Sequence, residues 1–522
     1  MLQYLKTRWE LFLVLAIFIA VKLPALHYPF YWDESWSYAP GVKLMYLHGP
    51  SLMPNAIDLF YSRGHPLLFY ASAASWMRLF GDSHISQHAF CLFLSILVVF
   101  SVYEISLKIF SRRTAVISLL LVPLQVSFYV QSTMLLPEVM IGLLSLLTLY
   151  FYSREKHLLT FFFCSALLLT KESGVAIGAV LGVCSAANLL NKNVPLSSRI
   201  KIFFSVFFAG CVIVTFYLLQ KKLNGWYLFP EHTNLVVWKW QPFWDKFRFS
   251  MDVLLAFDQK FRIFELLCLL SVISAIRSKN IRYAIPLLPA YFIYVAIDSK
   301  MGWMPEKIRF ALLLVPLSVT AYQLAYLQVN KTVAKQKFIY LSFIFVIAYL
   351  FFSCINFFTP RYLMAPLIVL MLLSAAWFDL IIHVLHRNVF YIVLLFITGI
   401  SLYGFYTNTG LGDISLGAFD GMTVEQNVVD FAEQQNWYDK HIAAPNFQNT
   451  EHLTKPYTGF LKGNKTFTNI TADIRPNTDF LIIDNIEPNG RLDTLLKTDS
   501  NYQLVYRTAS GKAWEEVYKK KK

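Results

Sequence analysis

Charged residues are scarce in this sequence of 522 residues. Asp, Glu, Lys and Arg make up 15% of it, whereas apolar residues make up 56% and the mean hydropathy is +0.49. A soluble protein of this length cannot bury so much apolar surface. The apolar residues also form long runs, such as 11–21, 114–131 and 339–358, each close to the length that crosses about 30 Å of hydrocarbon. The composition therefore excludes a soluble protein and predicts a polytopic α-helical membrane protein.

Cysteine is absent from the long loops and from the C-terminal hundred residues. All six cysteines lie in apolar runs, which indicates small apolar helix residues rather than a disulfide framework. The C-terminal region also lacks a Gly-rich phosphate loop, a metal-ligand cluster and a Ser/His/Asp arrangement at recognisable spacing. No internal repeat of the kind that organises many transporters is present.

Thirteen apolar segments predict about thirteen transmembrane helices in residues 1–408. The expected spans are 9–27, 84–108, 114–131, 134–152, 157–170, 172–190, 201–220, 253–276, 281–298, 308–328, 337–357, 362–385 and 388–406. The hairpin at 157–190 is the least distinct of these segments, so the total number of spans depends on it.

The net charge of +14 would indicate a nucleic-acid partner in a soluble protein, but here the basic residues gather in every second short loop. A cytoplasmic N-terminus places all of these loops in the cytoplasm, as the positive-inside rule requires. An odd number of spans then places the C-terminus outside. The basic residues therefore predict orientation and a membrane partner, and no nucleic acid. These residues are Arg112 and Arg113, Arg154 and Lys156, Lys192, Arg199 and Lys201, Arg277, Lys279 and Arg282, and Lys331, Lys335 and Lys337.

Two long loops, 28–83 and 221–252, face the extracytoplasmic side in this topology. Both are rich in Trp and Tyr, which favour the membrane interface, so both are expected to lie along the bilayer surface. The cytoplasmic loops are only a handful of residues long. Any chemistry is therefore expected on the extracytoplasmic side.

Residues 409–522 are polar with short apolar stretches and predict a small extracytoplasmic α/β domain. Thr423 and Gln426 form a capping-box pattern that predicts the start of a helix reaching about 436. Strands are expected at 442–445, 479–484, 502–507 and 513–519.

The adjacent carboxylates Asp33 and Glu34 are the strongest local signal for chemistry. They lie just outside the first span in an aromatic, apolar stretch, where an uncompensated charge is costly. A carboxylate there can accept a proton from a hydroxyl or hold a divalent metal against a phosphate. The alternative is a solvated pair at a helix start.

Basic residues near the outer ends of the spans are candidates for binding a phosphate. Arg63 and His65 close the loop 28–83, although a turn with these residues is ordinary. Lys171 lies beside Glu172 at the turn between two spans, and the pair suits either a phosphate contact or an interfacial ion pair.

Three further residues open spans from the outside. Glu138 is a lone acid at the start of a span, which makes it a functional candidate, with interfacial solvation as the alternative. Arg309 and Arg361 are each followed by an aromatic residue and then by a proline. The guanidinium of either residue can bind a phosphate or reach the membrane interface.

The order and spacing of these motifs resemble the GT-C glycosyltransferases that use polyprenyl-phosphate sugars, in particular the protein O-mannosyltransferases and the lipid A aminoarabinose transferases. The resemblance covers the membrane region. It consists of one span, then Asp33-Glu34, Gly-His-Pro at 64–66, Glu138, Leu-Thr-Lys at 169–171 and an Arg-aromatic motif with prolines. Leu67 stands where the family usually has a second proline. Glu138 stands where the family often has Asp. Arg361-Tyr362 matches the family's arginine motif by its letters, and Arg309 competes by chain position.

The resemblance implies an enzyme that moves a sugar from a polyprenyl-phosphate donor to a hydroxyl of a lipid, glycan or protein, with inversion. It implies that Asp33 is the catalytic base, with Glu34 beside it, that Glu138 positions the acceptor, and that Asp33 and Glu34 are the ligands of any divalent metal. It places the donor phosphate against the basic candidates, which are Arg63, His65, Lys171 and an arginine at 309 or 361. No segment is long enough for the lumenal β-trefoil of the eukaryotic O-mannosyltransferases, so a multi-pass protein of the bacterial inner membrane is expected.

Two other functions fit a chain with many spans. A transporter or lipid flippase predicts charged residues near the bilayer midplane and broken helices in repeated halves, whereas the candidates here gather at the outer interface. A non-catalytic membrane scaffold predicts that Asp33→Ala is tolerated.

Overall fold

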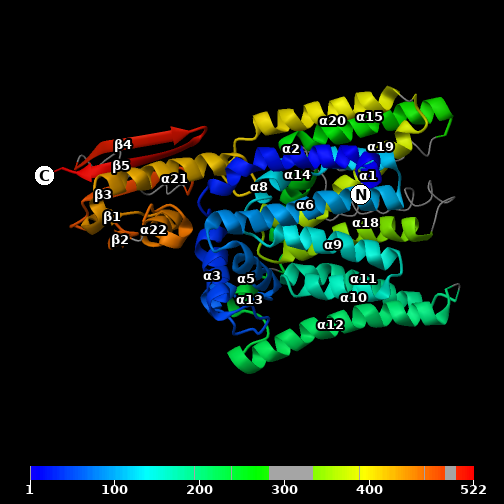
Figure 1. Cartoon of the computed structure of the whole chain (residues 1–522), viewed down its shortest axis with the longest axis horizontal. Coiled ribbons are helices and arrows are strands. Elements are labelled where there is room, and N and C mark those ends of the chain that lie inside the picture. The colour runs from blue at the N-terminus through cyan, green and yellow to red at the C-terminus, as the bar shows by residue number, and fades with distance from the viewer. Residues whose placement is uncertain are drawn as a thin grey trace.

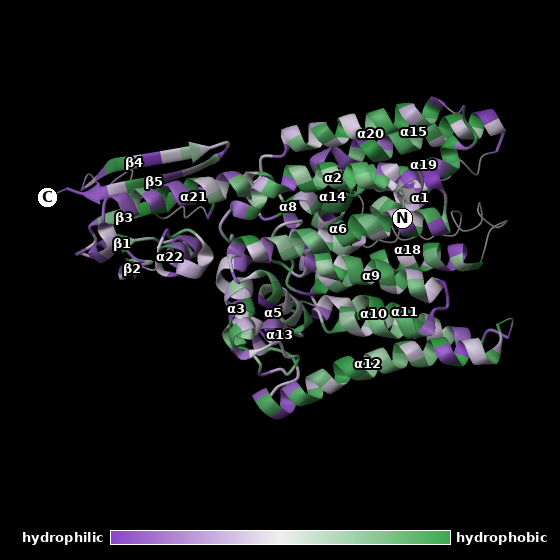
Figure 2. Cartoon of the chain, viewed as in Figure 1, coloured by the Kyte–Doolittle hydropathy of each residue, from purple (hydrophilic) through white to green (hydrophobic). Residues whose placement is uncertain are grey.

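A computed structural model shows a bundle of long helices with a small sheet beyond one end of it (Figure 1). It describes residues 2–192, 194–236, 238–280, 333–386, 388–463, 465–487 and 501–521. Hydrophobic residues follow the helices of the bundle, and hydrophilic residues are frequent at its two ends and in the C-terminal region (Figure 2).

Within the described residues, seven helical segments are long and apolar enough to cross a membrane. They are Trp9–His27, His84–Ile109, Glu172–Leu189, Leu196–Asn224, Val333–Ile355, Pro360–Ile382 and Asn388–Thr407, and two shorter apolar helices are Glu138–Ser153 and His157–Leu168. The polytopic helical architecture is confirmed. The count of thirteen stays a prediction, because the spans expected at 281–298 and 308–328 lie outside the described residues.

Helices and shorter helical turns make up the bundle. They are α1 (Leu2–Thr7), α2 (Trp9–Lys22), η1 (Leu23–His27), α6 (His84–Ile109), α7 (Arg112–Leu121), α8 (Val126–Gln131), α9 (Glu138–Ser153), α10 (His157–Leu168), η3 (Glu172–Gly174), α11 (Val175–Leu189), α12 (Leu196–Asn224), α14 (Trp240–Leu255), η4 (Phe257–Gln259), α15 (Lys260–Ser278), α18 (Val333–Ile355), η6 (Pro360–Leu363), α19 (Met364–Ile382) and α20 (Asn388–Thr407).

Two of the expected spans are interrupted. The segment 114–131 forms α7 and α8 with Pro123 between them, because proline supplies no N–H for the helix ladder. The segment 253–276 is broken where Asp258 and Gln259 have positive φ angles of 57° and 63°. This turn packs closely on α20, since a Cβ on Gly404 would lie 2.3 Å from the carbonyl oxygen of Asp258.

The loop 28–83 folds into short helices at the end of the bundle nearest the sheet (Figure 1). These are η2 (Glu34–Tyr38), α3 (Ala39–His48), α4 (Leu59–Ser62) and α5 (Leu68–Phe80). In α5, Phe69, Ala73 and Met77 recur every four residues and are buried, whereas Leu79 is 77% exposed. This amphipathic pattern is typical of a helix that packs one face on the protein and exposes the other.

The loop 221–252 contains α13 (Pro230–Asn234) and most of α14. The expectation that this whole loop lies on the surface is wrong for α14. Trp244 and Phe247 are buried, and α14 packs against α18 and η6. Its apolar face is strong enough to bury the helix in the bundle, where the sequence suggested an interfacial segment.

In its described residues, the C-terminal region combines two α-helices and two short 3-10 helices with a five-stranded sheet. Its elements are α21 (Gly417–Gln434), η7 (Trp437–Asp439), β1 (His441–Ala443), α22 (Phe447–Thr454), η8 (Pro456–Thr458), β2 (Asn469–Thr471), β3 (Phe480–Asp484), β4 (Tyr502–Ser510) and β5 (Ala513–Lys520). The strand order is β2-β1-β3-β5-β4; β1 pairs in parallel with β2 and β3, and β5 pairs antiparallel with β3 and β4.

The four expected strands are confirmed, while β2 and α22 were not expected. The predicted capping box is wrong, because α21 starts at Gly417 and Thr423 lies inside it. The Thr423 hydroxyl donates to the carbonyl oxygen of Phe419 at 2.7 Å, one turn earlier, and Gln426 donates to the carbonyl oxygen of Phe460.

The C-terminal region rests on the segment that follows the first membrane helix. The backbone N–H of Phe30 donates to Thr458 at 2.8 Å, and that of Trp32 donates to the side chain of Gln448 at 2.9 Å. The rings of Trp36 and Phe447 meet edge to face with centroids 5.9 Å apart. Residues more than 400 positions away therefore hold the backbone before Asp33 and contact the Trp36 side chain after it.

Candidate functional site

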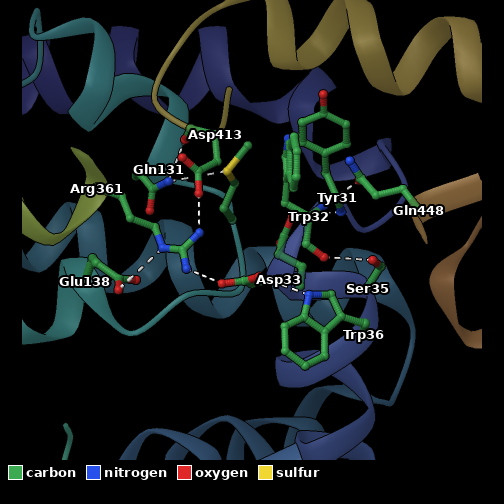
Figure 3. A network of polar contacts seen from close by, with 12 residues as sticks. Tyr31, Trp32, Asp33, Ser35, Trp36, Gln131, Glu138, Arg361, Asp413 and Gln448 are labelled. Carbon is green, nitrogen blue, oxygen red and sulfur yellow. Dashed lines mark hydrogen bonds and ion pairs between the residues drawn. The ribbon is translucent and has the colours of Figure 1, made fainter. Parts of the chain in front are cut away.

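Asp33 lies at a bend between the first membrane helix and η2. Trp32, before it, has a left-handed φ of 50°, and the π-helical turn η2 begins directly after it. The Trp36 indole N–H donates to Asp33 Oδ1 at 2.9 Å. This turn directs the Asp33 side chain toward the membrane bundle (Figure 3).

Arg361 joins three carboxylates from distant parts of the chain (Figure 3). It opens the helix pair η6 and α19 and is 4% exposed. Its Nη2 donates to Asp33, its Nη1 donates to Asp413, and its Nε lies 3.7 Å from Glu138 Oε1. Charge-assisted contacts of this kind compensate the cost of removing a guanidinium and carboxylates from water.

The carboxylate of Glu138 is shared with a second cation. Lys171 Nζ donates to Glu138 Oε1 at 2.8 Å, and both side chains are buried. The Lys171 ammonium also lies 4.1 Å from the centroid of the Tyr362 ring. Glu138 begins α9 immediately after Pro137, while Lys171 lies in the turn after α10, so two neighbouring helix ends supply this pair.

The electrostatic balance keeps Asp33 ionised. Burial raises the pKa of Asp33, but the Arg361 charge and the hydrogen bonds from Arg361 and Trp36 outweigh burial, so its pKa lies below the usual value. An Asp33 carboxylate held this way can accept a proton, and it becomes a stronger base if Arg361 turns to another anion.

Glu34 contacts a different group of residues from its neighbour. Its Oε1 accepts from the backbone N–H of Leu135 and lies 3.2 Å from His88 Nε2, and its Oε2 accepts from the backbone N–H of Tyr31 at 3.1 Å. The Glu34 side chain is fully buried. These contacts tie the turn before η2 to α6 and to the segment before α9.

His65 belongs to a second polar cluster on the same outer face. His65 Nδ1 lies 2.6 Å from Glu172 Oε2, and the His65 ring stacks on His232 of α13 with centroids 4.9 Å apart. The two histidines and Glu172 each offer one ligand atom within 4.8 Å of the others. Burial, with the nearby His65, lowers the pKa of His232 to about 4, so its ring is neutral at pH 7 and its nitrogens can bind a metal.

Two imidazoles and a carboxylate are a donor set that suits zinc. Among the described residues this is the group that could hold a metal ion, and neither Asp33 nor Glu34 belongs to it. The backbone N–H of Leu68 donates to the carbonyl oxygen of Leu169 at 2.9 Å and holds the two segments together.

Arg63 lies between the Arg361 network and the His65 cluster, and its contact with the first is through Trp36. Its guanidinium lies 5.3 Å from the centroid of the Trp36 ring and pairs with Glu231 of α13. Arg63 has a positive φ of 46° and Gly64 one of 72°, and a Cβ on Gly64 would lie 2.8 Å from the Trp226 ring. Glycine at 64 therefore lets the loop turn against the 226–232 segment.

The structure brings together four of the residues singled out in the sequence, which are Asp33, Glu138, Lys171 and Arg361. Arg63 lies beside this group, while His65 and Glu34 have other partners. Lys171 pairs with Glu138 and Glu172 contacts His65, so Lys171 and Glu172 do not pair with each other. Arg309 lies outside the described residues.

Sequence reasoning missed Trp36, His232 and Asp413. Trp36 and His232 stood in aromatic loops that were interpreted only as interfacial. Asp413 follows the last expected span in a polar stretch, and nothing in its neighbours distinguishes it. Its position opposite Arg361 depends on the return of the chain from α20 to α21.

Solved structures of one other protein superpose on nearly the whole chain. ArnT from Cupriavidus metallidurans in the apo state matches with a TM-score of 0.50 and 12% identity, covering 96% of this chain and 97% of that chain. The same protein bound to undecaprenyl phosphate matches with a TM-score of 0.51 and 13% identity, covering 97% of both. This chain has the GT-C fold.

A sequence comparison agrees with the GT-C fold over part of the chain. The family model described as dolichyl-phosphate-mannose-protein mannosyltransferase matches residues 64–183. That range begins at Gly64, beside the His65 cluster, and includes Glu138 and Lys171 of the Arg361 network. No curated protein matches the chain significantly. The resemblance to GT-C proteins noted from five weak motifs is thus confirmed for the fold.

Proposed function

We propose that this protein is a membrane glycosyltransferase that moves a sugar from a polyprenyl-phosphate donor to a hydroxyl of a lipid, glycan or protein acceptor. The observation that carries the proposal is the contact of the buried cations Arg361 and Lys171 with the half-buried Asp33 and the buried Glu138. Such a site offers cations for a leaving phosphate and a carboxylate for an attacking hydroxyl. The GT-C fold, and the undecaprenyl phosphate bound by ArnT, support the class of donor.

The donor phosphate would bind Arg361 and Lys171, with Arg63 and His65 on the approach to them. As the bond between the anomeric carbon and the phosphate oxygen breaks, negative charge grows on that oxygen. Buried cations that are already in place stabilise this charge more than water does. The Arg361 fork also orients the phosphate, since guanidinium groups bind its oxygens in pairs.

Asp33 would act as the general base. The acceptor hydroxyl passes its proton to Asp33 while its oxygen attacks the anomeric carbon from the face opposite the phosphate. The polyprenyl phosphate then leaves with the electron pair of the broken bond, and the sugar configuration inverts. Glu138, held by Lys171, would position the acceptor. Glu34, by its contacts, would support the turn that carries Asp33.

The reaction would occur on the extracytoplasmic side of a bacterial inner membrane. Basic short loops favour a cytoplasmic N-terminus, with residues 1–408 as the catalytic membrane domain and 409–522 as an extracytoplasmic domain. Labelling of intact cells with a membrane-impermeant maleimide tests this orientation. A cysteine introduced as Asp473→Cys should react, and one introduced as Lys192→Cys should not.

A transfer assay tests the function itself. Purified full-length protein is incubated with a set of polyprenyl-phosphate sugars and extracted envelope acceptors, and transfer is compared between the wild type and Asp33→Asn. Loss of a general base lowers the rate by about 10²- to 10⁴-fold. Asp58→Asn is the matched control, because Asp58 lies in the same loop and its side chain caps α4 through Phe60 N–H.

Equal transfer by the wild type and Asp33→Asn would remove Asp33 from the mechanism. Absence of transfer with any donor, together with movement of labelled lipid across proteoliposomes, would favour a flippase instead. The anomeric configuration of the product, read by NMR, tests inversion.

A further inference from the structure

The connector between α20 and α21 returns to the outer end of the bundle and brings Asp413 to Arg361. Three hydrogen bonds hold its backbone. The Tyr31 hydroxyl donates to the carbonyl oxygen of Leu411 at 3.0 Å, Gln131 donates to that of Asp413 at 2.5 Å, and the N–H of Leu416 donates to the Asn408 side chain at 2.8 Å. The Asp413 carboxylate on this connector meets the Arg361 guanidinium (Figure 3).

Carboxylates already occupy both terminal nitrogens of the Arg361 guanidinium in this arrangement. Its two terminal nitrogens bind Asp413 and Asp33, and its Nε faces Glu138 at 3.7 Å. Because the side chain is 4% exposed, a phosphate cannot approach from solvent without displacing one of these carboxylates. A phosphate on Arg361 therefore requires an exchange of anions.

The three carboxylates differ in how firmly they are held. Asp33 also accepts from the Trp36 indole at 2.9 Å, and Glu138 also accepts from Lys171 at 2.8 Å. Within the described part of the chain, the Asp413 carboxylate accepts a hydrogen bond from Arg361 alone. Asp413 also lies on an irregular connector rather than at a helix start, so its side chain can move with the smallest change in structure.

The charges in the network favour the same exchange. Asp33, Glu138 and Asp413 face two cations, Arg361 and Lys171, which leaves one negative charge in excess. A phosphodiester would add another negative charge in a site of low polarity. Burial raises the pKa of Asp413 despite the adjacent Arg361, with Asp33 and Glu138 contributing, which agrees with Asp413 as the least stabilised of the charges around this arginine.

We propose that Asp413 occupies the position of the donor phosphate on Arg361 and is displaced when the donor binds. Asp413 is thus a positioning residue: it keeps the guanidinium extended and paired in the free protein. Its release loosens residues 408–416, which join the bundle to α21. Donor occupancy is thereby communicated to the C-terminal region. This inference rests on the proposed function, because it assumes that Arg361 receives a donor phosphate.

Binding of undecaprenyl phosphate to the purified full-length protein tests the proposal. Asp413→Asn keeps the shape and removes the competing charge, so we expect it to bind this probe about 10-fold more tightly, the equivalent of about 1.4 kcal/mol. Asp413→Glu keeps the competing charge and should bind like the wild type. Asp420→Asn, which removes a charge from α21 that accepts from Ser510, is the matched control and should also bind like the wild type.

The direction of the effect separates this proposal from a structural role. A residue that only supports the site would weaken binding when replaced, so unchanged or weaker binding by Asp413→Asn overturns the proposal. Arg361→Ala tests the underlying function separately. If the wild type and Arg361→Ala bind undecaprenyl phosphate equally, Arg361 does not receive the phosphate, and the proposed donor site is wrong.

Hydrogen exchange gives a second readout of the same event. Peptides that cover 408–416 should exchange faster in the wild type when undecaprenyl phosphate is bound, because displacement of Asp413 removes a contact that holds the connector. In Asp413→Asn these peptides should exchange equally fast with and without the probe. Slower exchange in the wild type on binding would mean that the connector closes on the ligand, and the proposal would be overturned.

Discussion

At the scale of single residues, Arg361 decides how the site is arranged. Three carboxylates reach it from segments that lie between 52 and 328 residues away in the sequence. The sequence pattern of an arginine followed by an aromatic residue and a proline was enough to nominate Arg361. It was not enough to find Asp413, because the partner of a charged side chain in a membrane protein depends on which helix ends meet.

Arg361→Lys tests the importance of the forked guanidinium. Lysine retains the positive charge but cannot bond two anions in a fixed plane, so we expect kcat/KM for sugar transfer to fall by about 10²- to 10³-fold. Arg262→Lys, on the exposed side of α15, should leave kcat/KM unchanged. Full activity of Arg361→Lys would show that charge alone suffices and that orientation by the fork is not used.

At the scale of elements, the outer face is built from short pieces that only long-range packing brings together. The turn before α5, the turn after α10 and helix α13 supply His65, Glu172 and His232 in turn. Apolar run length predicted the long helices well, because crossing a membrane imposes a minimum length. It could not place α13 or the buried α14, whose positions depend on partners elsewhere in the chain.

The cluster of His65, Glu172 and His232 predicts where a divalent metal binds. Protein purified without chelators is expected to carry about one zinc per chain, since three such ligands leave one tetrahedral position open. His232→Ala should lose the metal, as measured by elemental analysis. His48→Ala, an exposed histidine at the end of α3, should keep it, and so should Asp33→Asn. Zinc retained by His232→Ala but lost from Asp33→Asn would place the metal at the acidic pair instead.

At the scale of the whole molecule, the C-terminal region packs on the turn that carries Asp33. The C-terminal region contains a group of buried acids. Glu425 is 1% exposed and Glu515 is fully buried, and burial, with the neighbouring carboxylates, raises the pKa of each well above its usual value. A raised pKa means that folding favours the protonated form of such a carboxyl group.

This raised pKa predicts that the folded protein loses stability as the pH rises. Between the ordinary glutamate pKa and the higher pKa in the folded state, folding takes up protons, so each group costs up to about 1.4 kcal/mol per pH unit over that range. Below the ordinary glutamate pKa the group is protonated in both the folded and the unfolded protein, so this cost is absent. Glu515→Gln removes one such group and should reduce the fall in melting temperature between pH 5 and pH 8.

The exposed Asp473 supplies the control for this measurement. Asp473→Asn should follow the wild-type dependence of melting temperature on pH. A Glu515→Gln protein whose melting temperature falls as steeply as that of the wild type would show that Glu515 does not take up a proton on folding.

The amino-acid sequence alone determined the solvent, the class of fold and most of the functional candidates. Long apolar runs with few charges are not soluble in water, so they predict membrane spans. A carboxylate or an arginine at the end of such a run costs free energy to remove from water, which makes it a functional candidate. Tertiary structure decided which of these candidates meet. Asp33 and Glu34 are adjacent in the chain, yet a single turn sends one to Arg361 and the other to His88. The selection of Asp413 and His232 as partners also depends on the packing of distant segments, because a charge buried in a bundle is stabilised by the opposite charge that the fold places within reach.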